Sequence, residues 1–298
     1  MQMTFAEFDV QVLAKQLARR SGGGFHQIVE AWSDSLGRNN GFGWYLEVGP
    51  SLDWASAWQD RELFTFVPDT TVGNKVPYGH SDFRMLVSND DDVHAFYEAK
   101  FYPPDSIRAM VAYKRRGGVS WDSASDPVFL APGCVSDSPR PYYDSETDIM
   151  HLMFTAAATT GCYPAPPSGT DLQVYTRKAV SAADSAWAPL TYMYPSIGLG
   201  PIGGGVFAEA DTVHFFGSRT ENQSGWKVVT VIHRSGLRPP PASTGRSPTS
   251  IRSTLFWCLV MAIPDRSPRT SPHPSKGPAA TPSTWPGLDR WVRPAPTR

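Results

Sequence analysis

The amino-acid sequence predicts an all-β fold. Three segments recur along the chain, and each has an apolar strand, an acidic turn and a second strand that opens on apolar residues and a histidine. The histidines are His94, His151 and His214, which lie 57 and 63 positions apart. A strand-rich repeat of about 60 residues is typical of a β-propeller, in which each blade is a small antiparallel sheet.

Composition supports a folded protein with no bias toward charged partners. The chain has 298 residues, of which 41% are hydrophobic, so it can bury a sizeable core. Its formal net charge is −1 and its sequence pI is about 6.7. This balance favours neither nucleic acid nor a membrane surface as a partner.

The N-terminal segment, residues 1–77, is expected to contain a short helix and several strands. "MQMTFAEFDVQVLAKQLARR" has the spacing of an amphipathic helix that ends at "SGGG", and it lacks the apolar core of a signal peptide. "FHQIVEAW", "FGWYLEVG" and "ELFTFV" are predicted strands separated by Gly, Asn and Asp turns. The segment is open to two interpretations, a separate unit or an additional partial blade.

The central segment, residues 78–236, is expected to form successive four-stranded antiparallel sheets. Each histidine-containing hairpin is followed by a further strand: "RAMVAYKRR", "DLQVYTRKA" and "WKVVTVIHR". Because the three histidines occupy one equivalent strand position, we expect them to have a repeated packing role. No helix longer than two turns is expected in this range.

The C-terminal segment, residues 237–298, is predicted to be a disordered tail. It holds 13 of the 28 prolines and nine Lys or Arg residues against two acidic ones, and it shows neither helical nor strand periodicity. Its apolar stretch "TLFWCLVMAI" has about half of the roughly 20 residues that a membrane span needs. The abrupt change of composition suggests a truncated or frame-shifted reading of a longer protein.

A tryptophan follows a turn in two of the repeats. The first stretch, "GGVSWDSASDPVFL", and the second, "SAADSAWAPLTYM", contain Trp121 and Trp187. The first resembles the Asp-box of sialidases, roughly Ser-x-Asp-x-Gly-x-Thr-Trp, although two basic residues stand where the box has Ser and Asp. The resemblance implies that both tryptophans fill the space between strands, away from any catalytic face.

The resemblance to sialidases also implies a set of site residues. Arg84 matches the arginine that opens the family's first blade, and "YEAK" matches the acid-small-basic element, with Glu98 as the acid and Lys100 in place of arginine. Asp105 stands where the family has its acid/base aspartate. Arg84 and Lys100 are therefore expected to bind the substrate carboxylate, Glu98 to be a further substrate-binding residue, and Asp105 to act as the acid.

The resemblance ends near Gly236, before the region that would supply the tyrosine nucleophile and its glutamate. The chain therefore resembles about three of the six blades of a sialidase, and it is expected to be an incomplete or weakly active copy that removes terminal sialic acid. Two alternatives remain open, a non-catalytic carbohydrate-binding or interaction propeller and a propeller glycosidase that acts on another sugar.

No cofactor and no metal site are expected, because the three cysteines show no metal-ligand spacing. The expected partner is a sialylated glycan or another carbohydrate, without nucleic acid or a membrane span. Sialidases are often secreted or surface-bound, but the sequence does not reveal the compartment.

Overall fold

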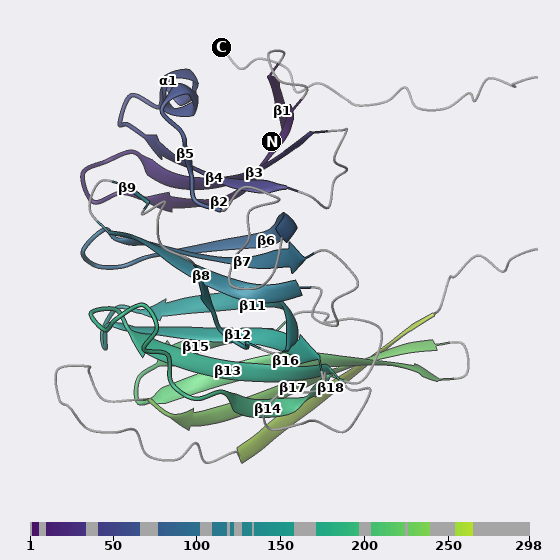
Figure 1. Ribbon diagram of the computed structural model, residues 1–298. Helices are drawn as coiled ribbons and strands as arrows, with labels where there is room; N and C mark the ends of the chain where they lie inside the picture. The colour runs from purple at the N-terminus through teal and green to yellow at the C-terminus, as the bar shows by residue number, and fades with distance from the viewer. Residues whose placement is uncertain are drawn as a thin grey trace, which may run out of the picture. The chain divides into compact units, whose positions relative to one another are not determined.

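The computed structural model shows an antiparallel all-β fold with almost no helix (Figure 1). The described strands and the helix belong to one compact unit, Met1–Pro264. The structure describes residues 2–5, 10–33, 41–65, 77–101, 109–117, 120–121, 127–132, 134–157, 171–196, 204–223, 226–238 and 254–264.

The first sheet contains five strands in chain order. They are β1 (Gln2–Phe5), β2 (Val10–Arg19), β3 (Phe25–Ser33), β4 (Phe42–Val48) and β5 (Glu62–Leu63). The short helix α1 (Trp54–Gln59) lies between β4 and β5, and its N-cap Asp53 accepts a hydrogen bond from the Ser56 amide at 3.1 Å.

The helix that we expected near the N-terminus is wrong, because its residues form β1 and β2. A β-bulge between Ala14 and Gln16 interrupts the pairing of β2 with β3. An extra residue at a bulge shifts the alternation of side chains by one position. As a result, the apolar positions of β2 change from even (Val10, Val12, Ala14) to odd (Leu17), and the run lacks the strict alternation of a regular strand.

The second and third sheets are antiparallel throughout. The second contains β6 (Pro77–Val87), β7 (Val93–Phe101), β8 (Ala109–Gly117), β9 (Ser120–Trp121) and β10 (Val128–Phe129). The third contains β11 (Val135–Asp144), β12 (Ile149–Ala157), β13 (Asp171–Ala179) and β14 (Thr191–Ser196). No helix occurs in the described part of residues 78–236, as the sequence predicted.

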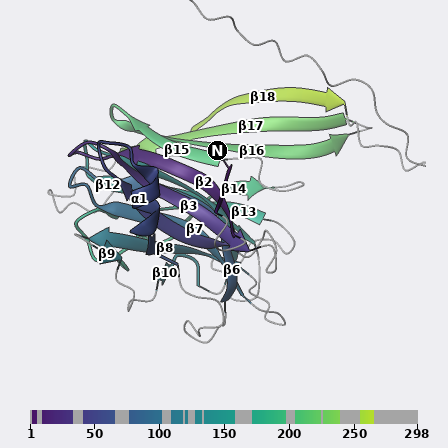
Figure 2. The ribbon, with the colours of Figure 1, turned by 90° about the horizontal axis from the view of Figure 1, so that it is seen from above.

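The fourth sheet corrects the predicted start of the tail. Its strands β15 (Gly204–Glu209), β16 (Thr212–Gln223), β17 (Trp226–Leu237) and β18 (Thr254–Pro264) lie side by side (Figure 2). Strand β18 falls in the segment that we expected to be disordered, and it pairs along most of β17. A continuous apolar run of strand length can satisfy its backbone in this way despite its Pro-rich flanks.

The first long strands of the four sheets, β2, β6, β11 and β15, are neighbours in sequence order. Side chains of consecutive sheets interdigitate and form the hydrophobic core. One cluster joins the first and second sheets, another the second and third, and a third the third and fourth. Strand β7 lies within this core, because residues on both of its faces are buried.

A histidine that is hydrogen-bonded to a ring on the next strand recurs at the same place in every sheet. The Nδ1 atom of the histidine lies 2.6 to 2.9 Å from a tyrosine hydroxyl on the next strand in the pairs His26–Tyr45, His94–Tyr113 and His151–Tyr175. In the fourth sheet, His214 is paired with His233 instead, at 3.0 Å. The three histidines singled out from the sequence are thus equivalent, and His26 is a fourth copy.

The sheet that follows covers each of the first two pairs with an aromatic ring and a cation. Trp121 meets the Tyr45 ring edge-on at 5.7 Å, and the Arg116 guanidinium lies 4.6 Å from the centre of that ring. Trp187 and Lys178 make the same two contacts with Tyr113, at 5.2 and 5.7 Å. Both tryptophans therefore pack between sheets, as the resemblance implied.

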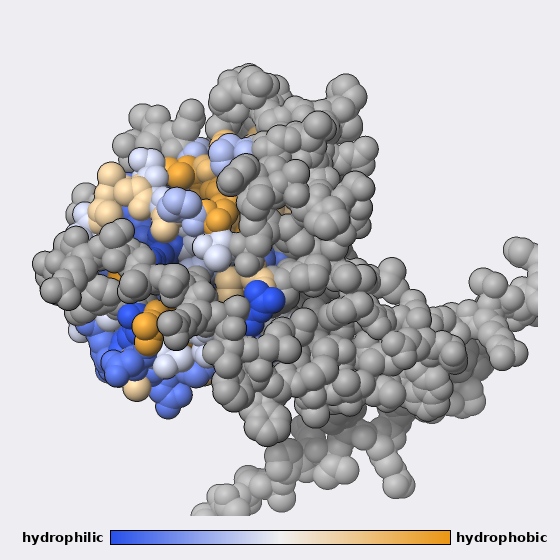
Figure 3. Space-filling view, turned by 90° about the horizontal axis from the view of Figure 1, so that it is seen from below, coloured by the Kyte–Doolittle hydropathy of each residue, from blue (hydrophilic) through white to orange (hydrophobic). Residues whose placement is uncertain are grey.

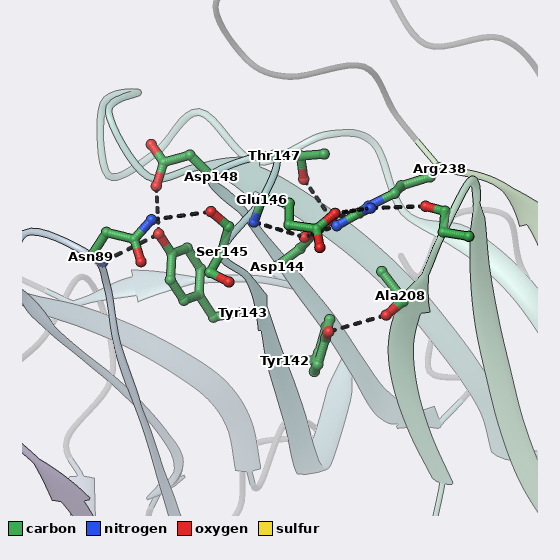
Figure 4. A network of polar contacts seen from close by, with 11 residues as sticks. Asn89, Tyr142, Tyr143, Asp144, Ser145, Glu146, Thr147, Asp148, Ala208 and Arg238 are labelled. Atoms are coloured by element: carbon green, nitrogen blue, oxygen red, sulfur yellow. Dashed lines mark hydrogen bonds and ion pairs between the residues drawn. The ribbon is translucent and has the colours of Figure 1, made fainter.

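Polar contacts from the turns connect neighbouring sheets (Figure 4). Asn89, in the β6–β7 turn, donates a hydrogen bond from its backbone N–H to the Tyr143 hydroxyl at 3.2 Å. Arg238 donates from Nε to Asp144 at 2.7 Å and from Nη1 to Glu146 at 2.6 Å, so the residue after β17 is fixed to the third sheet. Burial alone raises the pKa of Asp144, but the bonds to Asp144 from Arg238 and Thr147 outweigh burial and hold it at about 2.

The described surface mixes polar and apolar side chains. On the side shown in Figure 3, hydrophobic residues gather beside strongly hydrophilic ones. Large apolar side chains that are strongly exposed are Leu17, Leu52 and Leu237.

Trp121→Ala should lower the free energy of unfolding by about 3 to 5 kcal/mol, because it removes a ring that is 5% exposed and contacts Tyr45 and Phe64. Urea unfolding followed by circular dichroism measures the change. Leu52→Ala, at a side chain that is 49% exposed, should change it by less than about 0.5 kcal/mol. Equal losses for the two variants would contradict this packing role.

Stability should fall as the pH drops from about 6.5 to 4.5. Burial lowers the pKa of His94 to about 3 and that of His151 to about 4, while histidine in an unfolded chain titrates near 6.5. The unfolded state therefore binds more protons than the folded state in this window, so the free energy of unfolding decreases as the pH is lowered. A double variant, His94→Gln with His151→Gln, should show a flatter profile between pH 6.5 and 4.5 in urea unfolding.

Candidate functional site

Two arginines occupy equivalent positions on the neighbouring strands β6 and β11. Arg84 pairs in register with Phe96, and Arg140 pairs with Met153. Phe96 and Met153 each lie two positions after the repeated histidine of their strand. Each arginine follows a β-bulge, and each bulge contains a residue in the left-handed backbone conformation. These residues are Asp82, with a φ of 50°, and Ser138, with a φ of 55°, and each lies two positions before its arginine. Bulges redirect side chains, and here each one precedes a guanidinium.

The two guanidiniums converge on one carboxylate. Asp82 lies 2.6 Å from Nη2 of Arg84 and 3.2 Å from Nη1 of Arg140. Each arginine also donates to the carbonyl of the preceding residue, at 2.8 Å for Arg84 and 2.9 Å for Arg140. The arginine side chains remain 31% and 30% exposed, and each guanidinium has five N–H donors, so both retain donors for a further anion.

Glu98 lies next to this arginine pair, opposite Ser81 in the pairing of β6 with β7. The Ser81 hydroxyl donates to its carboxylate at 2.7 Å. Burial raises the pKa of Glu98, the Ser81 bond and Lys100 lower it, and the negative charges of Asp137 and Asp82 raise it, with a net increase. Glu98 therefore holds a proton more readily than an ordinary surface glutamate does.

His80 pairs with Ala99 on the face of the second sheet that packs on the first, whereas Lys100 lies on the opposite face of β7, with Glu98. The His80 amide donates to the Gly41 carbonyl at 3.0 Å, which connects the two sheets. Burial, with a smaller contribution from the charge of Lys100, lowers the pKa of His80 to about 3. His80 is thus a neutral imidazole at ordinary pH, whereas Lys100 contributes positive charge close to Glu98.

The structure brings together three of the residues that the sequence singled out. Arg84, Glu98 and Lys100 all lie on β6 or β7, and Asp82 links Arg84 electrostatically to Glu98. The fourth, Asp105, lies outside the described residues. Sequence reasoning missed Asp82 and Arg140.

A gapped comparison of the repeats could have found Arg140. The segment from Arg140 to His151 is one residue longer than the segment from Arg84 to His94, so that "DSPR" aligns with "SDFR" only if a gap is allowed. Without the gap, Arg84 is compared with Pro141 and its equivalent Arg140 is overlooked.

Several tyrosine hydroxyls are engaged elsewhere. Tyr142 donates to the Ala208 carbonyl at 3.3 Å, and Tyr143 donates to Asp148 at 2.8 Å (Figure 4). Tyr97 is completely buried, and burial raises its pKa far above the ordinary value. These three phenols are therefore poorly placed to attack a sugar at the arginine pair.

Comparisons with known proteins leave the family open. No protein-family model and no curated protein matches the sequence. Among solved structures, the fold is similar to an N-acetylgalactosamine deacetylase from F. plautii, crystallised with blood group B trisaccharide. The TM-score is 0.41 at 9% sequence identity, over 85% of this chain and 71% of that one, which is too weak to support a functional argument.

The described residues also bear on metal binding and on membranes. They contain no group of three or more His, Cys, Asp or Glu side chains placed to hold a metal ion. In the same part of the chain, no helix has the length and apolar character needed to cross a membrane.

Proposed function

We propose that this chain is a sialidase-like β-propeller unit that binds the carboxylate of a terminal acidic sugar between Arg84 and Arg140. The observation that carries the proposal is the convergence of these two guanidiniums on the single carboxylate of Asp82. Two guanidiniums that already hold one carboxylate between them can also donate to the carboxylate of an acidic sugar, which has the same planar geometry.

The electrostatics of the cluster favour an anionic ligand. Arg84, Arg140 and Lys100 carry three positive charges against the two negative charges of Asp82 and Asp137, while Glu98 holds a proton more readily than an ordinary glutamate because burial raises its pKa. Asp82 then acts as a positioning carboxylate that keeps both guanidiniums at the same place. A sialic acid has its carboxylate on the carbon where the glycosidic bond breaks, so this contact would also orient the scissile bond.

Turnover is expected to be low. Retaining cleavage needs a general acid and a separate nucleophile on the opposite face of the bond. Asp105 and Glu98 are candidates for the acid, but the hydroxyls of Tyr142 and Tyr143 are bonded elsewhere. General acid catalysis alone provides roughly 10² to 10⁴ in rate, compared with the 10⁶ or more that enzymes reach.

A non-catalytic carbohydrate-binding domain is the second candidate, and the engaged tyrosine hydroxyls favour it. The mode of binding would then depend on charge more than on stacking. Tyr45, one of the aromatics that could have stacked on sugar, is 1% exposed. Trp44 is partly buried and lies under the Arg61 guanidinium, 5.0 Å from the ring centre.

Sialyllactose should bind the purified chain and lactose should not, as measured by isothermal titration calorimetry. Arg84→Ala and Arg140→Ala should each weaken binding at least about tenfold, since a charge-assisted hydrogen bond is worth roughly 1.5 to 3 kcal/mol. Arg115→Ala is the matched control, because Arg115 is ion-paired to Asp92 and lies outside the cluster. Equal binding of both sugars, or equal losses for all three variants, would reject the site.

A fluorogenic sialoside should be hydrolysed at or near the background rate, and Asp105→Ala should not change that rate. Glu98→Gln serves as the comparison, because it removes the other candidate acid and keeps the side-chain shape. Hydrolysis well above background that Asp105→Ala abolishes would show that the chain is a complete enzyme, with one of Tyr142, Tyr143 or Tyr163 as the first nucleophile to test.

A further inference from the structure

The proposed anion site already holds a carboxylate of the chain itself. Asp82 offers one oxygen to each arginine, because its Oδ1 atom lies 2.6 Å from Nη2 of Arg84 and its Oδ2 atom accepts a hydrogen bond from Nη1 of Arg140 at 3.2 Å. The carboxylate of a ligand between the same two guanidiniums would use its oxygens in the same way. In this structure, Asp82 therefore occupies the place that the proposed ligand needs.

The two arginines need a counter-charge from the chain. Burial lowers the pKa of Arg84, the negative charge of Asp82 raises it, and the positive charge of Arg140 lowers it, with a net decrease. The two guanidiniums are therefore close enough to repel each other, and Asp82 offsets this repulsion. The two cations and one carboxylate carry a net charge of +1, which would become +2 if residue 82 were neutral.

The backbone at Asp82 does not require a carboxylate. Asp82 has a φ of 50° within the bulge of β6, and Ser138 has a φ of 55° at the equivalent position in the bulge of β11. Non-glycine residues seldom adopt this left-handed conformation, and Asn and Asp tolerate it better than most. Because the uncharged Ser138 adopts it in the same fold, the conformation of the bulge does not explain why residue 82 is charged. The two guanidiniums that the side chain faces do explain it.

The carboxylate of a ligand at this site would be repelled by Asp82. Two carboxylates that share one pair of guanidiniums lie close together, and like charges at such distances repel each other. The Asp82 side chain is 23% exposed, so it can reach water when its ion pairs break. Those ion pairs are partly exposed and therefore modest in energy. Asp82 can thus be displaced, but only by a ligand that binds the arginines more favourably than Asp82 does.

We propose that Asp82 is an internal competitor for the arginine pair and makes this site selective. Its carboxylate is bound by Arg84 and Arg140 until a sugar carboxylate takes its place, and it then turns toward solvent. A small anion such as acetate gains only the exchange of one carboxylate for another, whereas an acidic sugar adds the contacts of its ring and hydroxyl groups. The identity of the ligand rests on the proposed function, but the competition applies to any carboxylate.

Isothermal titration calorimetry with sialyllactose tests the competition. Asp82→Asn removes the charge and keeps a residue that tolerates the left-handed conformation, so it should raise the affinity at least about threefold. Asp82→Ser is a second variant, because it copies the residue of the equivalent bulge, and it should act in the same direction. Ser138→Asn is the matched control and should leave the affinity unchanged. Unchanged or weaker binding by both Asp82 variants would show that the carboxylate supports ligand binding, and would overturn the proposal.

Thermal unfolding in sodium acetate separates this proposal from the proposed function. At equal ionic strength and neutral pH, replacing sodium chloride with sodium acetate should raise the Tm of Asp82→Asn, because a bound anion stabilises the folded state. The Tm of the wild-type chain and that of Ser138→Asn should stay nearly unchanged. If sialyllactose binds to none of the proteins but acetate stabilises only Asp82→Asn, the proposed function is wrong and the competition stands. An equal shift in all three proteins, or no shift in any, would contradict the competition.

Discussion

The hydrogen bond between a buried histidine and a tyrosine on the next strand is the interaction on which the stacking of the sheets depends. An imidazole and a phenol can enter a core only when their polar atoms are paired, and here each pairs with the other. The paired rings then present mostly apolar surface, which the next sheet covers with an aromatic ring. The same solution recurs at each junction, so each sheet fixes the position of the one that follows it.

This stacking has a direct consequence for the candidate site. Because β6 and β11 are equivalent strands of neighbouring sheets, their bulges lie at corresponding levels, and the arginines that follow point to a common place. Neither Arg84 nor Arg140 alone defines a carboxylate site. The spacing between the sheets, which the histidine–tyrosine pairs and their aromatic covers maintain, creates it.

The fourth sheet departs from this pattern. Tyrosine is replaced by His233, and the face around it remains partly exposed in the described structure. At the same time, Arg238 bonds to Asp144 and Glu146 and fixes the end of β17 to the third sheet. The fourth sheet is therefore fixed to the third sheet at the end of β17.

The sequence by itself determined the all-β character, the strand-turn-strand repeats and the equivalence of His94, His151 and His214, because alternating apolar residues and turn residues are local signals. It also indicated Arg84, Glu98 and Lys100, which are close together along two adjacent strands. Whether the sheets close into the propeller that the resemblance implied stays a prediction. The sequence misled at β2, where a bulge mimics helical spacing, and at β18, where an apolar strand stands among prolines.

Only the tertiary structure decided the rest. Arg140 joins Arg84 because two sheets, more than fifty residues apart in the chain, are packed with their bulges at the same level. His26 and Tyr45 form a fourth copy of the repeated pair, although nothing in the local sequence around His26 distinguishes it. Contacts of this kind depend on register and on packing between sheets, which a single strand's sequence pattern does not specify.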